Sequence, residues 1–401
     1  MDINVKRSLP VLLAMLVAMT PFSLSTYLPA FPAIADSLGT DITTVQFSLT
    51  LYLVGFGLGQ LMGGTLSDTY GRRPVALTGV VVFIVSSLLL FNCQTSEQLL
   101  AFRFIQALGG GSSTVTAAAI IRDLFNKQDS ARMLSMISIM VLTAPLAAPA
   151  VGALALKLYG WRSIFLLLSG YSTLLLITLY FLLPETRPRQ PEGLKIKRIL
   201  SSYLSVFTHS RALSFVFTQS FSSGMQFSFL TASPFIYMGY FGISSDTYPI
   251  LFAANVLAMM LFNRLNVQLL NRWIPEKNLK IGICIQLSAN ILLFTSTFFQ
   301  PSLPVVVILV MLAIGSQSMI WPNASACSLA YFPDNSGSAT AVIGALRFMM
   351  GAIMGSVVSL LHNGTLYPVA FMMLACTTIS MICYLNAMRL PETKTLAHIR
   401  S

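Results

Sequence analysis

Charged residues are scarce in this chain of 401 residues. They make up 9% of the sequence, while 55% of the residues are hydrophobic; a soluble globular protein has about 25% charged residues. So few charges cannot cover a surface in water, which argues against a soluble enzyme or a nucleic-acid-binding protein. The apolar residues form runs of roughly 18 to 24, the length that a helix needs to cross the hydrocarbon of a bilayer. The sequence therefore predicts an all-α membrane protein that contacts lipid and binds no nucleic acid.

Metal-ligand and catalytic patterns are also missing. The five cysteines have neither paired spacing nor metal-ligand spacing, and the three histidines lie at predicted loops or chain ends. An intramembrane enzyme would need a facing nucleophile and base or a set of metal ligands. We therefore expect no disulfide, no metal, no cofactor and no enzymatic activity. A receptor or structural protein is a second alternative, but it would not need arginine inside the membrane.

Twelve membrane-spanning helices are predicted from the apolar runs and the polar breaks between them. An even number of spans places both termini on one side of the membrane. With the termini in the cytoplasm, 20 of the 24 Lys and Arg fall in cytoplasmic segments, as the positive-inside rule requires. We expect a multi-pass protein of the inner membrane, with spans near residues 8–30, 43–65, 75–92, 97–121, 131–155, 162–183, 211–234, 248–270, 279–299, 304–327, 338–361 and 367–388.

The longest polar stretch divides the twelve spans into six and six. It covers residues 184–210, which we predict to be a cytoplasmic linker between an N-terminal half (1–183) and a C-terminal half (211–401). A short repeat supports two related halves, because Leu-Pro-Glu-Thr-Arg at 183–187 and Leu-Pro-Glu-Thr-Lys at 390–394 follow the sixth and twelfth spans. Two six-helix halves with a site between them are typical of an alternating-access carrier. We expect a monomer.

The loop after the second span has the spacing G-x-L-x-D-x-x-G-R-R and contains Asp68, Gly71, Arg72 and Arg73. An ordinary hairpin held in the cytoplasm by its arginines is one interpretation. The spacing also resembles the signature loop of the major facilitator superfamily. We then expect these four residues to act in the conformational cycle, with Asp68 bonded to the loop arginines or to the helix start at 338–340.

Two further motifs lie in the fourth and fifth spans. Leu99, Arg103, Gln106 and Gly109 resemble the second motif of the superfamily, although Ala107 replaces a usual glycine. Arginine extended to the outer interface is the alternative for Arg103. The fifth span has two prolines followed by Gly152, which is similar to the motif of exporters rather than importers in this superfamily. Small residues allow close helix packing and prolines bend a helix, so Pro149 and Gly152 are predicted conformational residues.

Most of the chain resembles the Bcr/CflA family of drug:proton antiporters. The resemblance rests on Ser-Thr-Tyr-Leu-Pro at 25–29, the loop above, Arg122-Asp123, the segment 224–235 and Leu-Arg-Phe at 346–348. It implies the major facilitator fold and proton-coupled efflux of varied small molecules, including antibiotics. One position departs from the family pattern, since Ser25 replaces the usual acid. None of the 13 Asp and Glu lies deep in a predicted span.

Polar side chains inside the predicted spans are the candidate substrate ligands. About half of such residues are expected only to bond a neighbouring helix. Arg347 is the most informative, because it lies near the middle of its span, where a charge is usually placed against a cavity or a partner. The predicted substrate-binding residues are Tyr27, Arg103, Gln106, Gln226, Asn255, Gln317 and Arg347.

The sequence thus predicts a secondary exporter of small molecules that exchanges them for protons. A dedicated exporter or importer of one polar or anionic metabolite, such as a nucleoside or siderophore, is the alternative within transport. Because Arg103 and Arg347 stay protonated and no deep carboxylate accompanies them, we expect neutral or anionic substrates to be preferred over lipophilic cations. Proton coupling would then use Asp36, Asp41 or Asp68, or the titration of the substrate itself.

Overall fold

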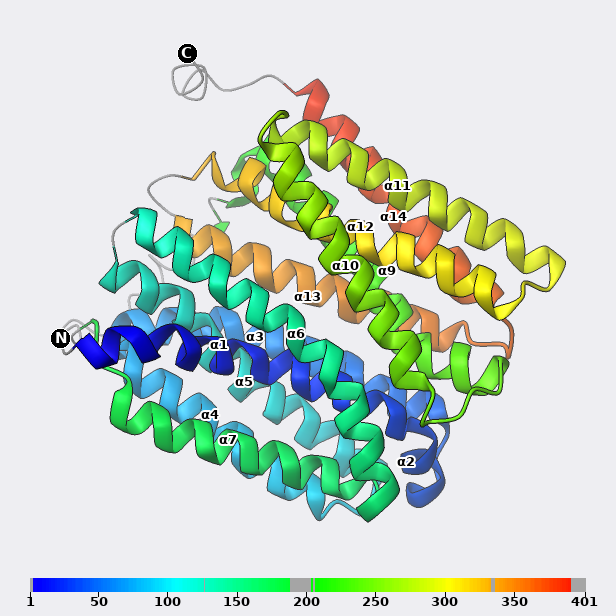
Figure 1. The fold of residues 1–401 in the computed structure, drawn as a ribbon, viewed down its shortest axis with the longest axis horizontal. Helices are drawn as coiled ribbons and strands as arrows, with labels where there is room; N and C mark the ends of the chain where they lie inside the picture. The colour runs from blue at the N-terminus through cyan, green and yellow to red at the C-terminus, as the bar shows by residue number, and fades with distance from the viewer. Residues whose placement is uncertain (1–2, 126, 188–202, 205, 333–335, 391–401) are drawn as a thin grey trace. The chain divides into compact units, whose positions relative to one another are not determined.

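The computed structural model describes residues 3–125, 127–187, 203–204, 206–332 and 336–390. These residues form helices and connecting turns with no strand among them, so the prediction of an all-α protein is confirmed. Within this part of the chain, twelve long helices follow the twelve predicted spans in order (Figure 1). They are α1 (Ile3–Tyr27), α3 (Ile42–Tyr70), α4 (Arg72–Phe91), α5 (Ser96–Leu124), α6 (Lys127–Tyr159), α7 (Arg162–Leu182), α9 (Ser210–Pro234), α10 (Tyr248–Leu270), α11 (Pro275–Ser296), α12 (Leu303–Leu329), α13 (Ser336–Leu360) and α14 (Tyr367–Arg389).

Two of the predicted spans continue as a further helical segment beyond their predicted ends. The first span continues beyond residue 30, through the 3₁₀ turn η1 (Leu28–Ala30) into α2 (Phe31–Leu38). Pro29 and Pro32 occupy first-turn positions, where the missing N–H has no helical partner to lose, and Gly39 ends α2 in the left-handed conformation at φ 59°. The seventh span likewise continues as the π-helix η2 (Phe235–Tyr240), and η3 (Thr297–Phe299) is a 3₁₀ turn that follows α11.

Ten helices among the described residues are long and apolar enough to cross a membrane. The long helix α9 is not among these ten. Its buried face carries many polar side chains, including Ser222, Ser223 and Gln219. These polar side chains lower the mean hydropathy of α9. The helix tolerates them because they face protein rather than lipid. An interior polar helix of this kind marks a functional region in a membrane protein.

The chain divides into two compact units by its internal contacts. Unit 1 consists of Met1–Lys195 with Ser244–Ala253, and unit 2 consists of Ile196–Ile243 with Ala254–Ser401. The predicted linker at 184–210 falls largely on residues outside the description, so its boundaries stay a prediction. The two units are described separately below.

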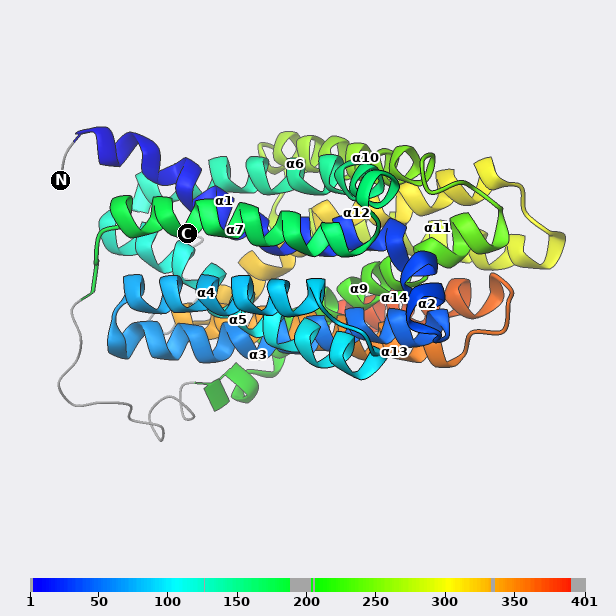
Figure 2. The same ribbon diagram turned by 90° about the horizontal axis from the view of Figure 1, so that it is seen from below.

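In unit 1, α5 packs closely against both α3 and α4 (Figure 2). Glycines make this approach possible on α3, where they recur every fourth residue. A Cβ added at Gly55, Gly59 or Gly63 would lie within 2.5 Å of α5. The backbones therefore touch without intervening side chains, as small residues permit between membrane helices. The other close pairs in this unit are α1 with α6 and α4 with α7.

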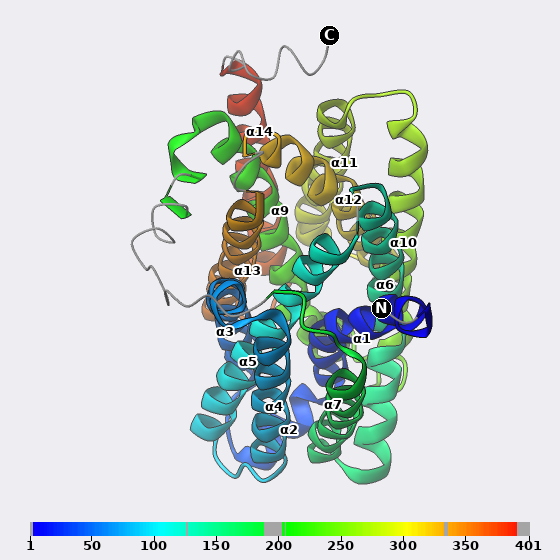
Figure 3. The same ribbon diagram turned by 90° about the vertical axis from the view of Figure 1, so that its left-hand side faces the viewer.

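In unit 2, α9 packs against both α13 and α14 (Figure 3). The ring of Phe227 on α9 covers Gly351 of α13, where an added Cβ would lie 2.3 Å from the ring. A separate apolar core joins α9, α11, α12 and α14. Its buried members are Phe215, Leu279, Ile283, Ile320, Ala324, Cys327, Tyr384 and Ala387.

Candidate functional site

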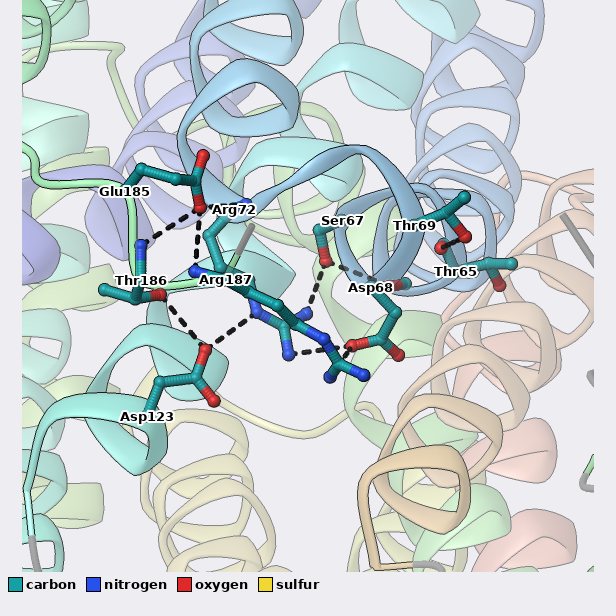
Figure 4. Close-up of polar contacts among 10 residues, drawn as sticks. Thr65, Ser67, Asp68, Thr69, Arg72, Asp123, Glu185, Thr186 and Arg187 are labelled. Atoms are coloured by element: carbon teal, nitrogen blue, oxygen red, sulfur yellow. Dashed lines mark hydrogen bonds and ion pairs between the residues drawn. The ribbon is translucent and has the colours of Figure 1, made fainter. Parts of the chain in front are cut away.

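The loop between α3 and α4 is held by ion pairs around Arg72. Its guanidinium contacts Asp68 at 2.7 Å and Asp123, on α5, at 3.0 Å, and it donates to the Ser67 hydroxyl at 2.8 Å. The Arg72 side chain is buried. A buried arginine with two carboxylates and a hydroxyl is well satisfied, so this residue fixes the end of α3 relative to α5 (Figure 4).

Glu185 caps the start of α4 from outside the helix. Its carboxylate accepts hydrogen bonds from the backbone N–H groups of Arg72 at 2.9 Å and Arg73 at 3.2 Å. The first N–H groups of a helix have no partner within the helix, and a carboxylate there also interacts favourably with the helix dipole. Gly71 precedes the cap at φ 103°, and an added Cβ would lie 2.6 Å from Glu185 Oε2. Glycine is required at this position for both reasons.

The residues that follow Glu185 tie the end of unit 1's last helix to the same loop. Arg187 pairs with Asp68 at 2.8 Å, and the Thr186 hydroxyl donates to Asp123 at 3.1 Å (Figure 4). Arg73 instead donates to the Tyr180 carbonyl at 2.6 Å. Asp68 therefore bonds one of the two predicted loop arginines and an arginine that the motif did not include. A contact of Asp68 with the helix start at 338–340 stays a prediction.

Arg103 lies at the centre of a sealed polar cluster in unit 1. Its guanidinium lies over the rings of Tyr27 and Tyr52, 4.3 Å from each ring centre, and one of its nitrogens donates to Gln106 at 2.7 Å and Ser23 at 3.1 Å. Gln106 in turn donates to Ser87. Tyr27 shares a hydrogen bond with Ser48 at 2.9 Å. Three predicted ligands, Tyr27, Arg103 and Gln106, are thus brought together.

The Arg103 cluster is closed to solvent. Arg103, Gln106 and Tyr27 are each 0% exposed, so the arginine does not extend to the outer boundary of its helix. Two of its nitrogens, Nε and Nη2, have no hydrogen-bond partner among the described residues. The aromatic rings offset part of the unpaired charge through cation–π attraction. In this conformation the cluster joins α1, α3 and α5 and is closed to a substrate.

A second polar cluster in unit 2 surrounds Arg347, which is less enclosed than Arg103. Arg347 Nε donates to the Ser223 hydroxyl at 3.1 Å, and Gln317 donates to the same hydroxyl at 3.0 Å. The guanidinium lies over the Trp321 ring, 4.5 Å from its centre. Arg347 is half-buried and forms no ion pair with a described residue. Its terminal nitrogens form no hydrogen bond within the described chain.

The remaining predicted ligands of unit 2 differ in whether they share hydrogen-bond partners with Arg347. Gln226 lies three residues after Ser223 on α9, hence on the same helix face, and its Oε1 atom has no partner among described residues. Gln317 also meets Gln286 and Ser222. Asn255 on α10 is buried and interacts with the Tyr237 phenol instead. The structure thus joins Gln317 to Arg347 through Ser223, places Gln226 on the same face of α9 as Ser223, and pairs Asn255 with Tyr237 instead.

The prolines and glycine of the fifth span lie on α6, where α6 meets α1. Pro149 and Gly152 are buried. A Cβ added at Gly152 would lie 2.0 Å from the Thr26 carbonyl oxygen. No side chain larger than hydrogen fits there, as predicted for a close helix contact. Nearby, a cavity of about 240 Å³ lies between α1, α6 and α7, lined by Val11, Ala14, Met15, Ala18, Phe22, Thr143, Ala144 and Tyr171.

Several functional side chains escaped the analysis of the sequence. Ser23, Ser87 and Ser223 are hydrogen-bond partners of the two arginine clusters, but serines in a span have no distinguishing pattern. Trp321 was detectable, because it lies four residues after Gln317 and so shares its helix face. In the sequence, Glu185 stands out only as part of the short repeat. Its hydrogen bond to the start of α4 joins residues more than a hundred positions apart, so local sequence does not show it.

A model of the Major Facilitator Superfamily matches residues 13–394. The chain belongs to the major facilitator superfamily. It is accordingly a multi-pass membrane transporter and not an enzyme, and the fold prediction is confirmed. Solved members share the fold at low identity: the E. coli xylose transporter XylE, in a partially occluded inward-open conformation, has a TM-score of 0.75 and 14% identity over 96% of this chain and 98% of its own.

Relatives with higher identity bear names of drug resistance, as the resemblance implied. A bicyclomycin resistance protein homolog of Haemophilus influenzae is 32% identical over 93% of this chain and 94% of its own. A chloramphenicol resistance protein of Pseudomonas aeruginosa is 30% identical over 92% of this chain and 89% of its own. Multidrug resistance protein MdtL of Klebsiella pneumoniae is 30% identical over 61% of this chain and 62% of its own.

Proposed function

We propose that this transporter exports small, structurally varied molecules across the inner membrane by alternating access. The names of its relatives support antibiotics among the substrates, since they include resistance to bicyclomycin and chloramphenicol. Proton exchange supplies the driving force in this proposal. The excess of Lys and Arg in alternate loops supports cytoplasmic termini, and a monomer is sufficient because each half supplies its own polar cluster.

The observation that carries the proposal is the open guanidinium of Arg347. Ser223 and Trp321 orient it, while its terminal nitrogens have no hydrogen bond to a described residue. A planar guanidinium fork binds carboxylates and other oxygen acceptors with two parallel hydrogen bonds. We therefore assign the polar or anionic group of the substrate to Arg347, with Gln226 and Gln317 beside it. Arg103 is enclosed within its own cluster and serves the packing of its half.

A substrate preference follows from the charges around this site. Arg347 has no carboxylate partner in the described chain, so a permanently cationic compound would meet repulsion without compensation. Uncharged, zwitterionic and carboxylate-bearing compounds would be accepted. Since arginine does not release its proton near neutral pH, the exchanged proton is carried by Asp36, Asp41 or Asp68, or by the acid group of the substrate.

Proteoliposome transport with an imposed pH gradient tests the proposal. The probes are chloramphenicol as an uncharged compound, a carboxylate-bearing antibiotic and a quaternary ammonium dye. We expect gradient-driven flux of the first two and little flux of the dye. Flux of a single polar metabolite with no flux of either antibiotic would favour the dedicated carrier. Robust gradient-driven transport of the dye would overturn the proposed preference.

A further inference from the structure

The hairpin between α10 and α11 presents positive charge that pairs with no described acidic side chain. Four cations of the segment 264–280 are exposed: Arg264, Arg272, Lys277 and Lys280. The one acidic residue of this segment, Glu276, is buried with 7% of its surface exposed. None of the four cations forms an ion pair with a described residue. This end of unit 2 therefore has a strong attraction for anions.

Two of these cations lie within the helices rather than in the connecting turn, beside side chains that suit contact with lipid. Arg264 is six residues before the end of α10, about 9 Å along the helix axis, and Lys280 is five residues after the start of α11, about 8 Å. The leucines beside Arg264 are exposed, Leu261 by 58% and Leu265 by 40%. A cation in such surroundings extends towards the membrane surface, where phosphate groups are the available anions.

The hairpin is also held in a fixed geometry. Asn266 on α10 accepts hydrogen bonds from Asn278 on α11 at 3.2 Å and from Asn323 on α12 at 2.7 Å, and all three amides are buried. In the connecting turn, Lys277 lies over the Trp273 ring, 4.0 Å from its centre. Tryptophan is enriched where membrane meets water. The cations thus project from two helices that buried hydrogen bonds hold together.

We propose that the α10–α11 hairpin is a binding site for an anionic phospholipid, with the phosphate held by Arg264, Arg272 and Lys280. Basic sites between membrane helices on the cytoplasmic side bind such headgroups, and the positive-inside rule places this loop there. A phospholipid fits better than free phosphate, because exposed Leu261 and Leu265 supply contacts for its acyl chains. The site is separate from the substrate site at Arg347 and does not depend on the proposed export.

Fluorescence of Trp273 tests the site directly. The chain has three tryptophans, so a full-length variant with Trp161→Phe and Trp321→Phe reports on Trp273 alone. In mixed liposomes, brominated phosphatidylglycerol should quench this fluorescence at several-fold lower mole fraction than brominated phosphatidylcholine. Adding Arg264→Gln and Lys280→Gln should reduce this preference by about fivefold for each cation removed, as expected for Lys or Arg near an anionic surface.

Two controls separate this site from general attraction to the membrane. Lys157→Gln removes a cation from the last turn of α6 and should leave the lipid preference unchanged. Arg264→Lys retains the charge and should preserve most of the preference. Soluble glycerophosphate should not relieve quenching by the brominated anionic lipid. Equal quenching by both lipids, an unchanged preference after Arg264→Gln with Lys280→Gln, or displacement by glycerophosphate would each overturn the proposal.

Discussion

Two arginines inside the membrane-spanning helices have opposite accessibility. Arg103 is enclosed by aromatic rings and is 0% exposed, while Arg347 is half-buried and its terminal nitrogens have no described partner. Their neighbours also differ, since two tyrosine rings flank Arg103 at 4.3 Å, whereas the Trp321 ring at 4.5 Å and the Phe348 ring at 5.6 Å flank Arg347. At the scale of single residues, Arg347 is thus the more accessible of the two arginines.

Two substitutions of Arg347 should separate the contributions of its charge and of its planar guanidinium to substrate binding. Arg347→Lys keeps the charge but loses the planar fork, so binding of a carboxylate-bearing substrate should weaken by about tenfold, the effect of one lost charge-assisted hydrogen bond. Arg347→Ala should weaken it by about a hundredfold. Binding is measured by substrate-dependent quenching or equilibrium dialysis of purified protein. Arg162→Ala, at a helix end, is the control, and equal affinity in all variants would exclude Arg347 from the site.

His362, between α13 and α14, should titrate below an ordinary histidine. Burial against the Phe235 ring, 4.2 Å away, lowers the pKa of His362 from 6.5 because it disfavours the charged imidazolium. The unfolded chain then binds this proton more readily, so stability should fall as the pH decreases below 6.5. NMR titration should show that Phe235→Ala raises the pKa towards 6.5. Phe299→Ala, which removes an exposed ring, should leave it unchanged.

At the scale of elements, the start of α4 depends on Gly71 and Glu185 together. Gly71→Ala should destabilise the protein by about 1–3 kcal/mol through its positive φ and more through the clash with the carboxylate. Glu185→Ala should lose about 1 kcal/mol as a missing cap. The clash requires both the added methyl group and the carboxylate. In thermal unfolding, the destabilisation of the double variant should therefore be smaller than the sum of the two single destabilisations. Gly160→Ala, at φ 78° with open space around it, measures the strain alone; strict additivity of the pair would exclude the clash.

The contact of α6 with α1 gives a second prediction at this scale. Gly152→Leu should abolish transport in protein that still inserts, because the Thr26 backbone occupies the space that the side chain needs. Gly170→Leu on α7 is the matched control, since an added Cβ there meets nothing within 4 Å. Transport is compared at equal amounts of folded protein. Normal flux in Gly152→Leu would show that α1 and α6 need not approach so closely.

The sequence predicted the helices well and the clusters only partly. Runs of apolar residues locate spans because the bilayer demands about 20 of them, and the ends were missed where proline continued a helix, as at Pro29 and Pro32. The motif loop also pointed to Arg72 and Asp68. The sequence could not show that Glu185 caps α4 or that Tyr52 covers Arg103, because those contacts depend on the packing of helices distant in the chain.

At the scale of the whole molecule, the charge inside the membrane is positive. None of the 13 acidic residues lies deep in a predicted span, and Ser25 occupies the position that is acidic in the family resemblance. Ser25 is buried on α1, two residues from each of Ser23 and Tyr27, which contact Arg103 from another face of the helix. The preference of the transporter for substrate charge should therefore respond to an acid placed at this position.

Ser25→Asp should shift transport towards cationic compounds. A new carboxylate in this region would offset the arginine charge and attract cations, so a quaternary ammonium dye should become a substrate while flux of a carboxylate-bearing compound falls. Flux is measured in proteoliposomes, with Ser25→Asn as the isosteric uncharged control. If Ser25→Asp and Ser25→Asn give the same profile, the charge at this position does not set the preference.

The glycines of α3 have a mechanical consequence. Where Gly55, Gly59 and Gly63 meet α5, the backbones approach so closely that few side chains could change rotamer to let one helix slide or roll on the other. Helices α3 and α5 are therefore expected to move together as one rigid body. Any change of shape during a transport cycle must then be taken up at joints where side chains separate the helices, and a spin-label pair across α3 and α5 should report one distance in every state.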